Sequence, residues 1–91
     1  MHSNPIKQRF FYQNKFVVCR LIEFTEESHF FTAAMESEKN YYTQRFIESE
    51  TGWMVVYNEE FFVENDFKML PQEITTQLLQ HLDERYPIKN S

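Results

Sequence analysis

The side chains that could perform chemistry in this chain are few, and their spacing fits none of the common catalytic patterns. The single cysteine, Cys19, follows the apolar run from Phe16 to Val18, where a thiol is typically an inert core residue. Carboxylates are plentiful, but pairs such as Glu26 and Glu27 are neighbours in sequence, and neighbouring residues of a strand point to opposite faces. We therefore expect no catalytic residues, and we expect that the chain is not an enzyme.

The histidines and the glycine give no sign of a metal or a cofactor. His2, His29 and His81 lack a second ligand at the short spacing that is typical of metal sites. Gly52 is the only glycine, which excludes the glycine-rich loops that bind phosphates and dinucleotides. The sequence predicts neither a metal site nor a cofactor.

Aromatic residues dominate the remaining sequence, with ten Phe, five Tyr and one Trp, and they fall into short segments typical of strands. The residues 13–14 and 37–40 are polar and suit turns between such strands. The segments that we expect to be strands are Arg9–Tyr12, Lys15–Phe24, His29–Glu36, Tyr41–Glu48 and Gly52–Tyr57, with Phe61–Val63 as a sixth.

The segment from Pro71 to Tyr86 has the pattern of an amphipathic helix. Ile74, Leu78 and Leu82 recur at four-residue spacing, and proline suits the first helical position. The sequence thus predicts an α+β fold, in which an antiparallel β-meander of five to six strands packs against one C-terminal α-helix. An alternative is a ββαββα fold with a helix at about 26–50. We favour the hairpin there, because the five polar residues 36–40 interrupt the helical stripe.

The length of 91 residues suits one domain. We expect residues 1–7 to be a disordered lead-in, residues 8–87 to form the domain and residues 88–91 to be a tail. No apolar run approaches the roughly 20 residues that span a bilayer, so we expect no membrane partner. The N-terminus lacks the apolar core of a signal peptide, and the lone cysteine forms no intrachain disulfide, which together predict a cytoplasmic protein.

Charge is distributed unevenly along the chain, whose net charge is −5. All fourteen Asp and Glu residues fall from Glu23 onward, and the preceding charges are all basic: Lys7, Arg9, Lys15 and Arg20. This segregation is typical of a domain with a basic edge and an acidic remainder, suited to self-association or to a basic partner. The negative total argues against a nucleic-acid partner, which normally requires a clustered basic face.

One helix covers one face of a sheet, and the other face of so aromatic a sheet would remain exposed. Such a face marks an interaction site. We hypothesise a small non-catalytic protein-interaction module that acts as a homodimer or on a protein partner, including the basic targets typical of inhibitor or immunity-type proteins. The alternative is a domain that binds a small apolar ligand in an aromatic-lined pocket between sheet and helix. The residues expected at the interaction surface are Phe10, Tyr12, Phe30, Tyr42, Trp53, Glu59 and Glu60.

Overall fold

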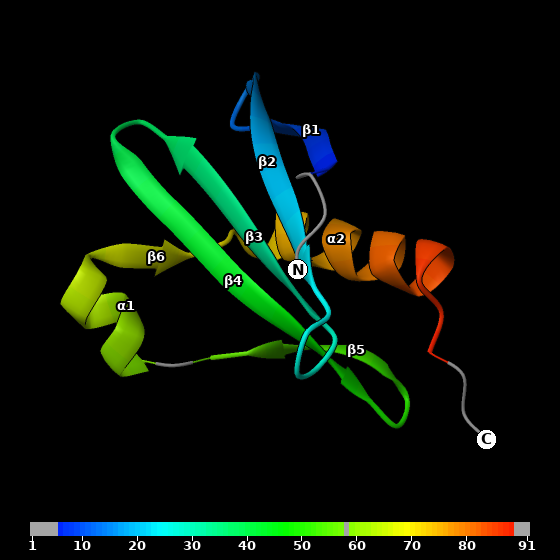
Figure 1. Cartoon of the computed structure of the whole chain (residues 1–91). Helices are drawn as coiled ribbons and strands as arrows, with labels where there is room; N and C mark the ends of the chain where they lie inside the picture. Colours follow the sequence, from blue (N-terminus) through cyan, green and yellow to red (C-terminus); the bar gives the residue numbers. More distant parts are fainter. Residues whose placement is uncertain (1–5, 58, 89–91) are drawn as a thin grey trace.

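A computed structural model describes residues 6–57 and 59–88, apart from the side chains of Glu59 and Phe61. Six strands and two helices follow one another along the chain (Figure 1). Their bounds are β1 (Ile6–Tyr12), β2 (Lys15–Phe24), β3 (Phe30–Ser37), β4 (Asn40–Ser49), β5 (Gly52–Val56), α1 (Glu59–Asn65), β6 (Phe67–Met69) and α2 (Gln72–Arg85). The predicted α+β fold, a meander packed against a C-terminal helix, is confirmed.

The first five strands pair with their chain neighbours in antiparallel order. Two-residue turns at residues 13–14 and 38–39 close the first and third hairpins, and all four turn residues have positive φ between 51° and 68°. That backbone has the twist that two-residue hairpins require. The hairpin expected within residues 26–50 is therefore confirmed, and the helical alternative there is wrong. The reason is the period of two along β3, whose residues Phe31, Ala33 and Met35 are all buried.

Strand β4 carries two different neighbours along its second edge. Its first edge pairs with β3 over almost its whole length. On the other edge, residues 45–49 pair antiparallel with β5, and residues 41–43 pair parallel with β6. Helix α1 connects these two short strands, so the chain leaves β4 at one end and returns beside it at the other (Figure 1).

The strand predicted at Phe61–Val63 is wrong, because this stretch lies in helix α1. Its burial pattern does not alternate, since Phe62 is buried and the three residues that follow it, 63–65, are all exposed. Acidic residues in the first turn favour a helix start, and Asp66, with φ of 54°, provides a left-handed residue just past the end. These local signals outweigh the strand preference of the aromatic residues. The sixth strand comes later, as β6.

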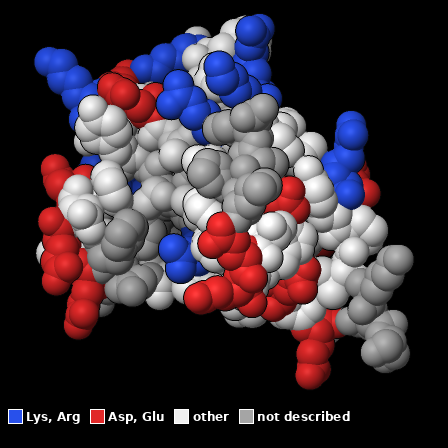
Figure 2. All heavy atoms as spheres, viewed as in Figure 1, with Lys and Arg blue, Asp and Glu red and all other residues white. Residues whose placement is uncertain are grey.

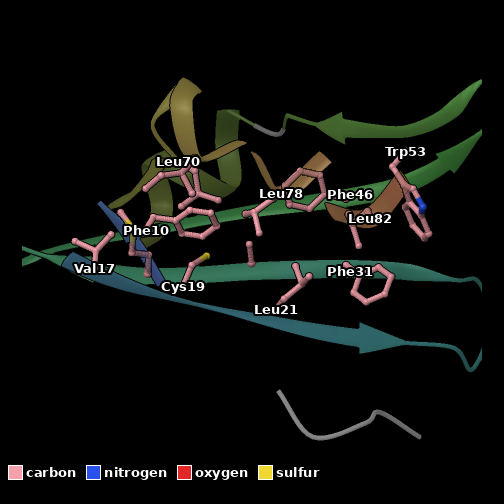
Figure 3. Close-up of a cluster of buried hydrophobic side chains, with 13 residues drawn as sticks. Phe10, Val17, Cys19, Leu21, Phe31, Phe46, Trp53, Leu70, Leu78 and Leu82 are labelled. Carbon is pink, nitrogen blue, oxygen red and sulfur yellow. The ribbon is translucent and has the colours of Figure 1, made fainter. Parts of the chain in front are cut away.

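Helix α2 crosses one face of the sheet, which we call the inner face (Figure 1). Figure 3 shows Leu78 and Leu82 of the helix directed towards side chains from β2, β3 and β4. Pro71 is the N-cap residue of α2 and Tyr86 its C-cap residue, so the predicted helix bounds hold to within one residue. The buried core consists of Phe10, Val17, Cys19, Leu21, Phe31, Ala33, Met35, Phe46, Trp53, Leu70, Ile74, Leu78 and Leu82.

Strand β5 is tied to the C-terminal end of α2. The Trp53 indole N–H donates to the Tyr86 carbonyl oxygen at 2.8 Å, and the Trp53 backbone N–H donates to Asp83 Oδ1 at 3.3 Å. Gly52 adopts φ of 142°, and a Cβ at that position would lie 3.2 Å from Asp83 Oδ1. Glycine at the start of β5 thus allows both the backbone conformation and the close approach of the helix.

The limits of the domain differ slightly from those expected. Ile6 and Lys7 belong to β1, so the lead-in expected at residues 1–7 is too long, and its residues 1–5 lie outside the described part of the chain. Ile88 packs against the core, whereas residues 89–91 of the expected tail also lie outside that part. Among the described residues, no helix is both long and apolar enough to cross a membrane.

Candidate functional site

The sheet has a second face, opposite α2, whose side chains are exposed or half-buried. We call it the outer face and define it by the register of β1 to β5. It consists of Lys7, Arg9, Phe11, Phe16, Val18, Arg20, Ile22, Phe24, Phe30, Thr32, Ala34, Glu36, Tyr41, Thr43, Arg45, Ile47, Met54 and Val56. Along β2 the two faces are both largely apolar, so burial of the inner side chains leaves an equally apolar set outside.

Two aromatic pairs lie on the outer face. Phe11 and Phe16 pack edge to face across the first hairpin, with ring centroids 5.2 Å apart, and the Arg9 guanidinium lies over the Phe16 ring at 5.8 Å. These contacts leave Phe11 60% and Phe16 67% exposed. Burying a phenyl side chain contributes about 1.5–3 kcal/mol, so a partner that covers this pair would gain considerable free energy.

The second aromatic pair lies on β2 and β3. Phe24 and Phe30 stack with ring centroids 4.7 Å apart, and the Arg45 guanidinium lies over Phe30 at 4.6 Å. Both rings are half-buried by this stacking. Contacts within the chain therefore cover Phe24 and Phe30 to a greater extent than they cover Phe11 and Phe16.

Between the two aromatic pairs the outer face is hollowed, with a volume of about 370 Å³. The methyl group of Ala34 leaves room in the middle of β3, where a larger side chain would fill the space. The residues that line the hollow are Val18, Arg20, Ala34, Met35, Glu36, Tyr41, Tyr42, Thr43 and Phe67. Tyr41 is 54% exposed, so the hollow has an accessible aromatic rim.

The charge of the outer face is opposite to that of the whole chain. Its charged side chains are Lys7, Arg9, Arg20 and Arg45, with Glu36 as the single acid in the set. Figure 2 shows Lys and Arg gathered mainly at the end of the molecule where Figure 1 places β1 and β2, whereas Asp and Glu are spread over the left side, the lower middle and the lower right of the view. The basic residues of the N-terminal segment thus lie on two adjacent strands, one of which is an edge strand of the sheet.

The residues that the sequence suggested for the interaction surface are not brought together. Phe10 and Trp53 are in the core, so their assignment to an exposed surface is wrong. Tyr12 and Tyr42 are half-buried and belong to the inner face by register, and Phe30 belongs to the outer face.

The two predicted acidic members belong to helix α1 and not to a strand of the sheet. Glu60 is exposed on α1, and the side chain of Glu59 lies outside the described part. The outer-face residues that sequence reasoning missed are Phe11, Phe16, Arg20 and Tyr41. Phe11 and Tyr41 are each one residue away from a chosen residue, so a change of face accounts for these two.

One histidine lies between two carboxylates. His29 Nε2 is 2.7 Å from Glu23 Oε2, and His29 Nδ1 is 2.8 Å from Glu48 Oε1. The ring also packs against Trp53, at a centroid distance of 5.1 Å. This arrangement ties the turn between β2 and β3 to β4 and to the core. Among the described residues, no group of three or more His, Cys, Asp or Glu is placed to hold a metal ion.

Cys19 is fully buried, as its position in an apolar run predicted. Desolvation by burial raises the pKa of the thiol from 9.0 to about 11, against a weaker lowering effect of a backbone hydrogen bond with Ala34. Since only the thiolate is nucleophilic, Cys19 is chemically inert in the folded chain near neutral pH.

We expect iodoacetamide at pH 8 to leave folded Cys19 unmodified while the urea-unfolded chain reacts readily. The pKa difference alone lowers the thiolate fraction about 100-fold, and burial further excludes the reagent. As the pH rises, the thiol of the unfolded chain ionises before that of the folded chain, whose pKa is raised to about 11. The contribution of thiol burial to the free energy of unfolding is therefore fully present below pH 9 and is lost as the pH rises through about 11. Mass spectrometry of timed samples measures the modification. Equal rates for folded and unfolded chains would contradict the buried position.

Comparisons with protein-family models, with curated proteins and with solved structures found no match to this chain.

Proposed function

We propose that this chain is a non-catalytic protein-interaction module that receives a protein on the outer face of its sheet. The observation that carries the proposal is the exposure of Phe11 and Phe16, and of Tyr41 at the rim of a hollow, on the face opposite α2. Contiguous apolar surface of this kind is uncommon on a monomer that acts alone.

The composition of the outer face supports a protein as the occupant. Phe, Tyr, Met and Arg are enriched where proteins meet, and Lys is depleted there. Three of the four cations of this face are Arg, and its exposed apolar residues include Phe16, Tyr41 and Met54. Arg and Tyr are also the residue types that most often dominate the binding free energy of an interface.

A second copy of the chain is one candidate for that protein, because closed two-fold dimers are the commonest oligomers. A small apolar ligand between sheet and helix has less support. That space is occupied by the buried side chains of Phe31, Phe46, Leu78 and Leu82 (Figure 3). The hollow of the outer face lies on the other side of the sheet.

The proposal is tested by selecting binders from a random peptide display library against the folded chain. We expect the selected peptides to shift the amide NMR signals of β2, β3 and β4, and to bind at least 10-fold more weakly to the variant Phe11→Ser/Phe16→Ser. Val63→Ser is the matched control, because Val63 is 73% exposed but lies on α1. Its affinity for the same peptides should be unchanged.

Sedimentation velocity of the chain itself tests the second copy as the occupant. A mass of twice the chain, reduced to the monomer by Phe11→Ser/Phe16→Ser, would support self-association through the outer face. A monomer at about 100 μM for which no peptide is selected, or whose peptides bind elsewhere, would overturn the proposed function.

A further inference from the structure

Two cations face each other on the outer face with no acid between them. Lys7 and Arg20 are direct partners across β1 and β2, and both are exposed. Arg9 lies two residues along β1 on the same face, opposite Val18. Like charges directly opposite each other on antiparallel strands are destabilising. We call Lys7, Arg9 and Arg20 the cation cluster.

The charge of the cation cluster is not compensated within the described part of the chain. No ion pair joins Lys7 or Arg20 to a described carboxylate, and Arg9 contacts the Phe16 ring. The neighbouring cation on β2, Lys15, does have an anionic partner, Glu38 Oε1 at 2.7 Å. The chain has fourteen acidic residues, yet none of those whose side chains are described forms an ion pair with this cluster.

The cation cluster borders the hollow. Arg20 belongs to both, and the other lining residues include Tyr41, Phe67 and one acid, Glu36. The three cations of the cluster thus outnumber the single acid beside them. The volume of the hollow, about 370 Å³, is sufficient for one large side chain from a partner. A carboxylate entering beside it would meet Arg20 and, along the same edge, Lys7. The exposed rings of Phe11 and Phe16 extend the apolar surface next to the cluster.

We infer that the occupant of the outer face is an acidic protein segment in which Asp or Glu residues accompany aromatic or aliphatic ones. This inference rests on the proposed function and assigns the chemistry of its partner. Carboxylates would neutralise the cation cluster, and an apolar side chain would fill the hollow above Ala34. Charge complementarity of this kind raises the association rate and selects among partners.

A second copy of this chain fits the face less well. In a two-fold dimer formed face to face, the cation cluster meets either itself or the end that carries Phe24 and Phe30. Neither arrangement supplies the anions, because Glu36 is the single acid in the outer-face set. The chain's other acids lie on the inner side, on helices or in turns.

A nucleic acid also fits less well than an acidic protein segment. A nucleic acid has a high density of negative charge, and the outer face has few cations to neutralise it. The net charge of −5 of the chain also repels a polyanion at long range. An acidic peptide carries far less charge and supplies the apolar side chains that the exposed rings of the face require.

The test is the composition and the salt dependence of the peptides selected by display. We expect enrichment in Asp and Glu together with Phe, Tyr or Leu, and an affinity that falls as salt is raised. In fluorescence polarisation, Lys7→Gln/Arg20→Gln should lower the affinity for the selected peptides at least 10-fold. Its thermal midpoint should be unchanged or higher, because a like-charge contact is removed. Arg85→Gln on α2 makes one such charge change on the opposite layer and should bind normally.

A second pair of variants tests the hollow. Ala34→Tyr fills it and should abolish binding of the selected peptides. Val63→Tyr places the same side chain on α1, at a position that is 73% exposed and outside the outer face, and should bind normally. Equal binding by Ala34→Tyr and Val63→Tyr would overturn the hollow as part of the site.

The outcomes separate this inference from the function on which it rests. Peptides that bind the outer face without acidic enrichment, or that bind the Lys7→Gln/Arg20→Gln variant equally well, would overturn the inference and leave the proposed function standing. Tighter binding of an oligothymidylate than of any selected peptide would overturn the assignment to a protein. A dimer that dissociates on Arg20→Gln substitution would identify a second copy as the occupant and overturn the inference.

Discussion

Replacing Phe31 by alanine should lower the free energy of unfolding by about 3–5 kcal/mol. The ring is fully buried between the sheet and α2, with the rings of Tyr86 at 4.8 Å and Trp53 at 5.2 Å. Its removal leaves a cavity where three elements meet, and the flanking rings lose favourable edge contacts. Urea unfolding followed by the fluorescence of Trp53, which adjoins the cavity, measures the loss.

Phe16→Ala is the matched control, since Phe16 belongs to the adjacent strand but lies on the outer face. Its ring is 67% exposed and its aromatic contact is Phe11, so we expect a change within about 1 kcal/mol. Similar losses for Phe31→Ala and Phe16→Ala would show that the outer face is covered in the isolated chain. That result would remove the basis for a partner on this face.

Phe31 and Phe16 show that the two faces of the sheet have different roles in this chain. The inner face holds the domain together, because α2 covers it. The outer face carries side chains of the same chemical type that contribute little to folding. Stability alone does not account for Phe11 and Phe16 on an exposed hairpin, since polar residues there would form the same turn at lower risk of aggregation.

Much of the fold could be predicted from the sequence, because local signals agreed with the tertiary structure. Residues 13–14 contain an asparagine that tolerates a left-handed backbone, and residues 38–39 lie between two strand-like segments. The α2 helix combines a proline at its start with Ile74, Leu78 and Leu82 on one stripe. Such patterns depend on a few neighbouring residues and need no knowledge of distant contacts.

The missed elements depend on context beyond the local pattern. Helix α1 contains only seven residues, too few to show a helical period clearly. Strand β6 has three residues and pairs parallel with β4, on the same edge of β4 with which β5 pairs antiparallel. No pattern within Phe67–Met69 indicates that β4 would offer it an edge. Two strands share this edge of β4 because α1 returns the chain to β4 after β5 has ended.

The candidate site could be predicted only in outline. The segregation of basic residues before Glu23 was visible in the sequence. That Lys7 lies opposite Arg20, and that Arg20 borders a hollow over Ala34, follows from the register of three strands. Register also decided which aromatic residues are buried, since both faces of β2 are apolar and alternation alone does not distinguish them.

A polar pair inside the core provides the second prediction. Gln44 and Thr75 are both buried, and the Thr75 hydroxyl donates to Gln44 Oε1 at 3.2 Å. Gln44 Nε2 is buried without a hydrogen-bond partner among the described residues. Thr75→Val would remove the one described partner of the amide, so we expect a loss of about 1–3 kcal/mol in the free energy of unfolding.

The double variant Gln44→Met/Thr75→Val should recover that loss and equal or exceed the stability of the unmodified chain. Methionine fills a similar volume without burying an amide, and replacement of both partners removes the unpaired groups together. The interaction free energy from the complete cycle, measured by urea unfolding, should therefore be about 1–3 kcal/mol. A double variant less stable than Thr75→Val alone would contradict this account, because Gln44 would then stabilise the core through its packing. If the double variant is the more stable, the pair serves mainly to fix where α2 lies on the sheet, and the amide NMR signals of α2 should broaden in it.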